Sequence, residues 1–483
     1  MKVLAAIAVL GVCAAAHAQE IGYDGARHLL NRAGFGATDA QVREYAPLGR
    51  REAVERLLAG ARREASVAPP AFVNEPFISY ARLRGTSEAE RQEALRNRLR
   101  QGFELRAWWL REMVLTPSPL TERMTLFWHN HFATSEQKVR SSYLMYRQNV
   151  LLRREALGNF GTLLHAVAKD PAMLVYLDNA GSRRQAPNEN FAREVMELFT
   201  LGEGRYGERD IKEAARAFTG WSIDRDSGEY RYRPFFHDPG EKTVLGRTGR
   251  FDGDAVLDIL LGRPETARFV TGKLWRELVS PTPDAAEVER LAAVFREARY
   301  EVKPLLRAML TSDAFWAPEN RAALVKSPVD VVIGTLRTFD IRPVDMRPAA
   351  FATAALGQNL FTPPNVKGWP GGEAWITSST LLARKQWIDR VFRGSDAMVA
   401  VAAPAETAMS EPAKGEGARL RRALETGMAS YAFDAPRWER SLASPADRAR
   451  LVLAMAPVNA PPEEAEGVER VRALVLDPVY QLR

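Results

Sequence analysis

Along most of the chain, apolar residues recur at every third or fourth position with charged residues between them, which is the spacing of one face of an α-helix. Alternation of apolar and polar residues, the pattern of a half-buried strand, is nearly absent. This pattern predicts an all-α fold: a large multi-helix array with long polar loops and at most a short β-hairpin. The clearest helical spacing is found in residues 41–58, 87–114, 255–261, 266–279 and 286–315.

Proline marks the start of two further predicted helices. Pro119 follows Thr116-Pro117-Ser118, and Pro328 follows Ser327, so each proline fits the first turn of a new helix. Residues 222–250 are instead polar and rich in Gly, Pro, Tyr and Arg. They predict a long surface excursion from the helical array, with room for a short hairpin.

Residues 1–18 have the pattern of a secretory signal peptide. Lys2 precedes an apolar stretch, and Ala16-His17-Ala18 satisfies the small-x-small rule for cleavage before Gln19. We therefore expect a periplasmic or secreted protein, most simply in a Gram-negative periplasm. The alternatives are a buried N-terminal helix and a lipoprotein modified at Cys13. No other apolar run approaches the roughly 18 to 20 residues that cross a bilayer, so we expect no transmembrane segment in the mature chain.

Composition limits the chemistry that the mature chain can use. The chain has 483 residues, 46% of them hydrophobic, which is enough to bury the core of one large domain or two. The net charge is +7, and the sequence contains no clustered basic stretch, so we expect no nucleic-acid partner. Cys13 is the only cysteine, and its removal would leave no thiol. A metal site would therefore have to use His, Asp and Glu.

The composition shifts to Ala, Pro, Glu, Gly and Ser over residues 396–418, which predicts a flexible linker. We therefore expect a helical domain over residues 19–395 and a small C-terminal helical segment over residues 419–483.

Two of the five histidines left after cleavage, His129 and His131, lie two positions apart in Phe127-Trp128-His129-Asn130-His131-Phe132. In an extended loop both rings would point to one side and could bind one metal ion. On a helix they would lie about 200° apart and could not. If the helix from Pro119 continues, His131 joins an apolar stripe and becomes a buried histidine. His129 then joins Glu122 and Thr125 on the opposite, polar stripe.

A second group of polar residues follows Asn188, a good helix cap. Asn190, Glu194 and Glu197 come at positions i, i+4 and i+7, so one edge of a helix would carry an amide and two carboxylates, with Arg193 beside them. Paired carboxylates can bind a divalent metal or divide the roles of general acid and base. The same spacing is also typical of an ordinary solvated helix face.

Two loops contain further candidate binding residues. His237, Asp238 and Lys242 lie in the polar excursion, where they could serve function or simply stabilise a turn. Residues 361–375 form a loop rich in Pro, Gly and Trp that includes Trp369. This loop could stack against a sugar or cap the helical core.

Together these segments resemble a bacterial family known as domain of unknown function 1800. The resemblance is carried, in order, by residues 28–36, 122–124, 127–132, 188–202, 217–221 and 363–369. It implies a mainly helical, commonly exported protein without an established reaction. It also implies a possible partner, because such proteins are often encoded beside an exported protein of alkaline-phosphatase or sulfatase-like fold.

Two functional hypotheses follow. In the first, the protein is a metal-dependent periplasmic hydrolase in which His129 and His131 are ligands of a divalent metal. Glu194 or Glu197 is then a further ligand, and the other carboxylate activates a bound water. In the second, it is a non-enzymatic binding or assembly partner of another exported protein, and the polar motifs form a structural network. Both lead us to expect that a histidine of the pair meets Glu194 or Glu197, because a buried imidazole needs a polar partner.

Overall fold

The computed structural model describes residues 19–75, 77, 85–224, 226–393, 427–428, 431, 433–444 and 446–483. The expected signal peptide and the expected linker, residues 396–418, lie outside these ranges. In the part of the chain that the structure describes, no helix is long and apolar enough to cross a membrane.

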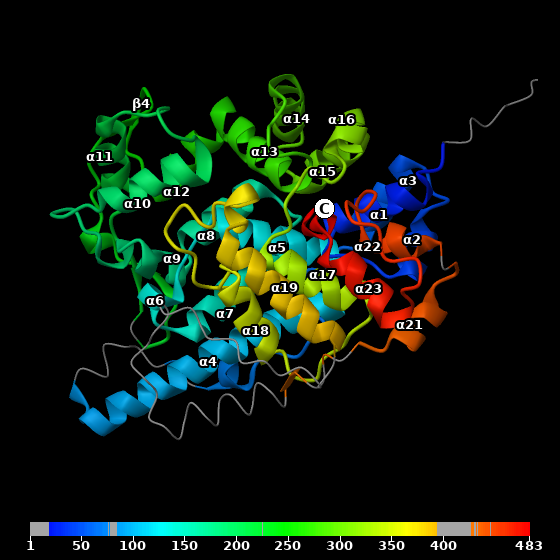
Figure 1. Cartoon of the computed structure of the whole chain (residues 1–483). Coiled ribbons are helices and arrows are strands. Elements are labelled where there is room, and N and C mark those ends of the chain that lie inside the picture. Colours follow the sequence, from blue (N-terminus) through cyan, green and yellow to red (C-terminus); the bar gives the residue numbers. More distant parts are fainter. Residues whose placement is uncertain are drawn as a thin grey trace, which may run out of the picture.

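The fold is mostly all-α, as the apolar spacing predicts (Figure 1). The α-helices are α1 (Gly22–Ala33), α2 (Asp39–Tyr45), α3 (Arg50–Ala59), α4 (Glu88–Leu115), α5 (Pro119–His131), α6 (Glu136–Val139), α7 (Ser142–Glu155), α8 (Phe160–Ala168), α9 (Pro171–Tyr176), α10 (Glu189–Glu194), α11 (Glu208–Ala217), α12 (Gly253–Leu261), α13 (Pro264–Leu278), α14 (Ala285–Glu297), α15 (Val302–Leu310), α16 (Asp313–Trp316), α17 (Pro328–Thr338), α18 (Arg347–Ala355), α19 (Ser378–Arg393), α21 (Ala435–Ser441), α22 (Asp447–Val452) and α23 (Gly467–Leu476). Short 3₁₀ segments are η1 (Ala71–Asn74), η3 (Asn179–Gly181), η5 (Pro234–Phe236), η6 (Pro318–Asn320), η7 (Gly372–Trp375) and η11 (Pro478–Gln481), and η4 (Val195–Thr200) is a π-helix.

The polar excursion contains two small antiparallel hairpins rather than one. Strand β1 (Trp221–Ile223) pairs with β2 (Tyr230–Tyr232), and β3 (Lys242–Val244) pairs with β4 (Arg247–Gly249). Leu245 and Gly246 connect β3 to β4, and both have positive φ, the conformation that two-residue hairpin loops require.

Two predicted helices are broken where the backbone turns. Residues 41–58 divide into α2 and α3, and Pro47 lies in the gap, where its missing N–H cannot continue a helix. Residues 286–315 divide into α14, α15 and α16. Arg299 and Tyr300 take positive φ values of 52° and 66° at the first break. Apolar spacing continues across both turns, so it hides them.

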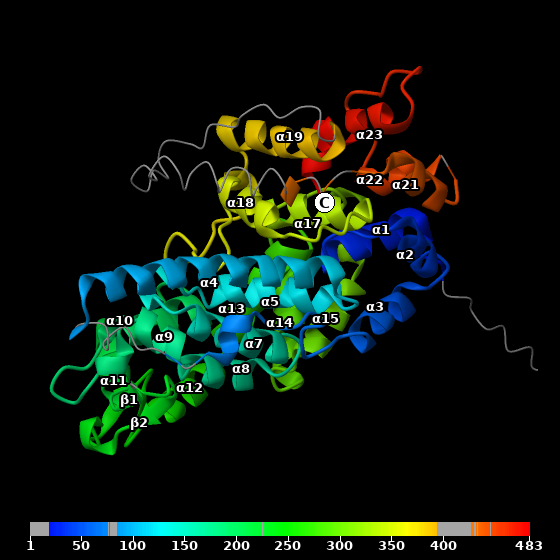
Figure 2. The same cartoon turned by 90° about the horizontal axis from the view of Figure 1, so that it is seen from below.

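Helices α5 and α17 lie at the centre of the array and are buried on nearly every side. Figure 2 shows α17, α18 and α19 on one side of the long helix α4, and α7, α8 and α9 on the other. Helix α5 joins two hydrophobic clusters, because Met124 and Trp128 pack into one and Leu126 into the other. The expected polar face of α5 is therefore not solvated: Glu122, Thr125 and His129 are each at most 1% exposed.

Helix α4 differs between its two halves. From Gly102 onward it contributes buried residues such as Trp108 and Trp109, whereas residues 88–101 bury no side chain fully. The first half is about 20 Å long, at 1.5 Å per residue, and projects from the body of the protein (Figure 1).

The described part of the C-terminal segment packs onto the rest of the array. Helix α23 lies against α19, and Val325 forms an antiparallel bridge with Leu482. Val471 and Val475 of α23 belong to the same hydrophobic cluster as Val329 of α17.

Candidate functional site

Three consecutive side chains at the end of α5 connect that helix to two other segments. His129 contacts the backbone of Phe361, Asn130 contacts Trp369, and His131 contacts the backbone of Phe199. Because these residues lie on a helix, the two imidazoles point to different sides, as the helical alternative requires. The His-Asn-His motif thus joins the 361–369 loop and the π-helix to the centre of the fold.

His129 is a buried, neutral acceptor. Its Nε2 accepts a hydrogen bond of 3.2 Å from the Phe361 N–H, so the ring proton lies on Nδ1. Trp109, Phe361 and Trp369 surround the ring, with centroids 5.2 to 5.7 Å away. Burial lowers the pKa of His129 to about 3, because the charged form would lose its hydration. This imidazole stays neutral at any physiological pH.

His131 has the opposite tautomer. Its Nε2 lies 3.1 Å from the Phe199 carbonyl, which can only accept, so Nε2 carries the proton. Burial and the nearby charge of Lys273 lower the pKa of His131 well below its usual value. Its Nδ1 is buried without a hydrogen-bond partner among the described residues.

Asn130 holds the 361–369 loop because its side-chain amide forms hydrogen bonds with both the N–H and the carbonyl of Trp369. Its Oδ1 accepts from the Trp369 N–H at 2.7 Å, and its Nδ2 donates to the Trp369 carbonyl at 3.3 Å. Gly368 makes this approach possible: its φ is +81°, and a Cβ there would lie 2.2 Å from Asn130 Oδ1. Trp369 is 5% exposed and contacts the His129 ring. In this structure the loop caps the core.

The expected carboxylate edge continues from α10 into the π-helix η4. Asn188 caps α10 as predicted, since its Oδ1 accepts from the N–H groups of Asn190 and Phe191. The Leu201 N–H then bonds to the Met196 carbonyl, five residues back, at 2.7 Å. The Thr200 hydroxyl also donates to the Val195 carbonyl at 2.7 Å. A π-turn is frequent at functional sites, and the spacing of apolar residues does not reveal it.

Glu194 and Glu197 remain close enough to influence each other. Burial, followed by the charge of Glu197, raises the pKa of the half-buried Glu194. Among the described residues, none donates a hydrogen bond to the Glu194 carboxylate, whereas the Tyr206 hydroxyl donates to Glu197 Oε2. Lys367 approaches from the 361–369 loop and pairs with Glu203 at 2.8 Å. The carboxylates therefore lie beside a loop that the histidine motif anchors.

The other predicted residues of this region face solvent. Asn190 is exposed, and Arg193 forms a two-bond pair with Glu208, 2.9 Å for each bond. An exposed pair of this kind contributes little stability.

His237, Asp238 and Lys242 build a turn. The His237 ring bonds to the Thr219 carbonyl at 3.0 Å, and Asp238 pairs with Arg216 at 2.7 Å. The Lys242 ammonium donates to the Asp238 and Gly240 carbonyls at 2.7 and 2.8 Å. All three side chains thus have structural partners.

The remaining two histidines also contact protein groups. The buried His28 Nε2 donates to the Phe315 carbonyl at 3.0 Å. The ring of His165 lies between Asp254 and Asp258, at 2.8 and 3.1 Å, in a partly exposed cluster with Lys169.

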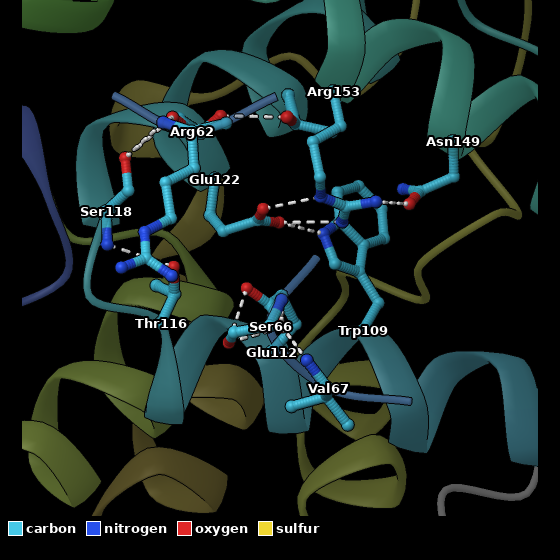
Figure 3. Close-up of polar contacts among 12 residues, drawn as sticks. Arg62, Ser66, Val67, Trp109, Glu112, Thr116, Ser118, Glu122, Asn149 and Arg153 are labelled. Carbon is cyan, nitrogen blue, oxygen red and sulfur yellow. Dashed lines mark hydrogen bonds and ion pairs between the residues drawn. The ribbon is translucent and has the colours of Figure 1, made fainter. Parts of the chain in front are cut away.

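Figure 3 shows a buried network that the sequence motifs did not single out. Glu122 on α5 accepts two hydrogen bonds from Arg153, of 2.6 and 2.8 Å, and one of 2.8 Å from Trp109 Nε1. Arg153 also donates to Asn149 Oδ1 at 2.7 Å. The side chains of Glu122 and Arg153 are each 1% exposed. Helix periodicity placed Glu122 on a polar stripe of the helix, so it did not reveal that this carboxylate is buried.

The four residues proposed for a metal site do not meet as a ligand group. Among the described residues, no three or more His, Cys, Asp or Glu side chains are grouped so that they could hold a metal ion. The expected contact between a histidine of the pair and Glu194 or Glu197 stays a prediction. His131 bonds to the main-chain carbonyl of Phe199, in the same π-helix as Glu197.

Comparison with known proteins agrees with the resemblance in the motifs. The family described as "Protein of unknown function (DUF1800)" matches residues 28–482, nearly the whole chain. No curated protein and no solved structure matches. The protein belongs to the DUF1800 family.

Proposed function

We propose that this protein is exported and serves as a non-enzymatic binding or assembly partner of another exported protein. The observation that carries the proposal is the protruding half of α4. Leu95 and Leu99 of this half are 47% and 38% exposed, and Phe103, just beyond it, is 36% exposed. Because they follow one another at four-residue intervals, they form a single apolar stripe along the helix. A contiguous apolar stripe on a projecting element is typical of a protein interaction site.

The local sequence keeps this half of α4 helical. The Ser87 hydroxyl accepts from the Glu90 N–H, and Glu90 accepts from the Ser87 N–H in return, which forms a capping box. Arg91 pairs with Glu88, and Arg100 with Glu104, each at 2.9 Å. A helical half of about 14 residues has little stability on its own, so these local contacts preorganise it for docking.

A groove lies along the same half of α4. It has a volume of about 830 Å³ and is lined by Leu95, by aromatic residues that include Phe77 and Tyr143, and by charged residues of both signs. An amphipathic helix or strand from a partner could therefore place apolar side chains against Leu95 and charged ones at the rim.

The hydrogen bonds of the motif residues also support a non-enzymatic role. The backbone already contacts the Nε2 atoms of His129 and His131. It also contacts both side-chain polar atoms of Asn130. These residues hold segments together. Each imidazole is buried and its Nε2 already has a backbone partner, so neither Nε2 is free to bind a metal or to transfer a proton.

Export is part of the proposal and has its own test. The apolar stretch and the Ala16-His17-Ala18 site predict cleavage before Gln19. Terminal sequencing of protein from the periplasm or culture medium is expected to read Gln19-Glu20-Ile21. A full-length chain retained in the cytoplasm would contradict export.

The family resemblance suggests an exported protein of alkaline-phosphatase or sulfatase-like fold, encoded nearby, as the partner. The purified partner would be titrated onto the immobilised mature chain. The double variant Leu95→Glu, Leu99→Glu is expected to weaken binding at least tenfold, because two desolvated apolar contacts become charges. Val458→Glu is the matched control, since Val458 is 70% exposed in the C-terminal segment.

Equal binding by the wild type and the double variant would contradict the role of α4, and no binding by the wild type would contradict this partner. Sedimentation of the mature chain alone provides a further check. A self-association that the double variant abolishes would identify the stripe as an interface between copies of this chain instead.

A hydrolase that uses Glu194 and Glu197 is the second candidate. The raised pKa of Glu194, caused first by burial and then by the charge of Glu197, favours it, because general acids and bases are often carboxyls whose pKa is displaced in this way. Elemental analysis of untagged protein separates the metal-dependent form of this candidate from the binding role. A stoichiometric metal that both Glu194→Gln and Glu197→Gln remove would favour the enzyme.

A further inference from the structure

Five buried arginines and one partly buried lysine gather where α1, α5, α17 and α19 meet the last residues of the chain: Arg27, Arg32, Arg123, Arg384, Arg483 and Lys326. The two carboxylates that pair with members of this cluster are Asp330 and Glu277, and both pair with Arg123 and Arg483. Within the described residues, no carboxylate lies within ion-pair distance of the other four cations. The cluster therefore has an excess of buried positive charge.

Residues 480–483 bring three of these cations together. Arg384 Nη1 donates to the Gln481 side chain at 3.0 Å, and the Lys326 N–H donates to the Gln481 carbonyl at 2.7 Å. The Lys326 ammonium lies 3.8 Å from the centre of the Tyr480 ring. Arg483 reaches Glu277 at 2.9 Å, and its Nε lies 3.4 Å from Asp330. The cations thus converge on one short stretch of chain.

Several guanidinium nitrogens in the cluster are buried without a hydrogen-bond partner among the described residues. They are Nε and Nη2 of Arg384, Nη1 of Arg483, Nε and Nη1 of Arg27, and Nε of Arg32. Nε of Arg483 also lacks a hydrogen bond but lies within ion-pair distance of Asp330. Arg32 and Arg384 are 0% exposed. Buried donors on a charged group are costly to leave unpaired, so nitrogens of this kind in one cluster indicate a missing acceptor.

The partners that these cations do have are mostly neutral. Arg32 donates to the Leu278 and Val279 carbonyls, and Arg27 donates to the Ala454 carbonyl. Carbonyl oxygens satisfy N–H groups but do not neutralise charge. Burial is the main cause that lowers the pKa of Lys326 to about 7. The charge of Asp330 opposes this shift, and the charges of Arg27, Arg384 and Arg483 add to it.

We propose that this cluster binds a small inorganic oxoanion of the phosphate or sulfate class between Lys326, Arg384 and Arg483, with Arg27 and Arg32 beside it. A tetrahedral oxoanion supplies several acceptor oxygens and up to two negative charges, so it matches both the free N–H groups and the excess charge. Guanidinium groups bind such oxygens in charge-assisted pairs. A water molecule would satisfy the donors but leave the charge.

The first test measures the anion directly. The mature chain is purified in Tris and sodium chloride without phosphate or sulfate, denatured in acid, and its released anions are measured by ion chromatography. Close to one equivalent of phosphate or sulfate per chain is expected if the site retains its ligand, and Arg384→Met is expected to release none.

The second test follows the thermal unfolding midpoint as millimolar phosphate, sulfate or chloride is added at constant ionic strength. An anion that binds the folded state alone raises the midpoint. Phosphate or sulfate is expected to raise the wild-type midpoint by several degrees more than chloride, and Arg384→Met or Lys326→Met is expected to lose this difference. Arg268→Gln, which changes an exposed pair with Glu289, is the control and is expected to keep it.

A third measurement compares the unfolding midpoints of Arg384→Met and the wild type without added oxoanion, in protein that releases none. In an empty cluster the substitution removes repulsion and should leave the midpoint unchanged or raise it, whereas in saturating oxoanion it should lower the midpoint. Identical responses of the wild type and both variants to all three anions, together with no released oxoanion, would overturn the proposal. The use of Lys326→Met keeps the test decisive if Arg384→Met does not fold.

Discussion

Replacement of Arg153 by methionine is expected to lower the free energy of unfolding by about 3 to 5 kcal/mol, because it leaves the Glu122 carboxylate buried without its cation. Glu122 would keep one hydrogen bond, from Trp109 Nε1, and its side chain is 1% exposed. Solvent therefore cannot replace the two bonds from Arg153. Urea unfolding followed by fluorescence measures the change as a lower midpoint at an unchanged denaturant slope.

The double variant Glu122→Gln, Arg153→Met distinguishes two costs: the loss of the Glu122–Arg153 ion pair, and the burial of an unpaired Glu122 charge. Glutamine removes the charge but still offers an oxygen to Trp109 Nε1, so the double variant is expected to be more stable than Arg153→Met alone. The matched control is Arg268→Gln, which breaks an exposed pair and is expected to change stability by less than about 1 kcal/mol. If the double variant is the least stable of the three, the buried charge is not the dominant cost.

Substitution of His129 by glutamine is expected to change the pH dependence of stability. The pKa of this ring is about 3 in the folded protein and about 6.5 in an unfolded chain, so the unfolded state binds one more proton as the pH falls below 6.5. The contribution of His129 to the free energy of unfolding is thus complete above pH 6.5 and falls by about 2 kcal/mol by pH 5. Glutamine can accept from the Phe361 N–H but does not titrate.

Urea unfolding at pH 7.5 and pH 5 tests this expectation. The stability gap between the wild type and His129→Gln should shrink by about 2 kcal/mol at the lower pH. Thr125→Val, on the same buried helix, is the control and should show a gap that does not change with pH. The test compares two proteins because a second group also makes stability depend on pH. Burial raises the pKa of Asp170 to about 7, so protonation of Asp170 stabilises the folded state as the pH falls, which opposes the effect of His129. An equal gap at both pH values would mean that the folded site admits a charged imidazole.

The sequence predicted helices best where local chemistry marks their ends. Asn188 forms the cap that its side chain indicates, and Pro119 and Pro328 begin helices. The break between α14 and α15 was hidden because Arg299 and Tyr300 adopt positive φ, which depends on tertiary packing rather than residue type.

The candidate site shows a similar limit. The sequence correctly indicated that His131 would be buried if the helix continued, but not that His129 would be buried too. Helix periodicity assigns a residue to a face, but it does not say whether a second layer of helices covers that face. For His129 the covering residues are Trp109, Phe361 and Trp369, two of which lie more than 200 residues further along the chain.

The π-helix at Val195–Thr200 has a consequence for comparing this chain with its relatives. A π-turn holds one residue more than the α-turn it replaces, so the segment is equivalent to a one-residue insertion in an ordinary helix. Loss of that residue would rotate everything after it by about 100° relative to α10. Glu194 and Glu197 would then no longer share their present orientation, and the Phe199 carbonyl would turn away from His131. An alignment gap of a single position here therefore marks relatives whose carboxylates and histidine are arranged differently.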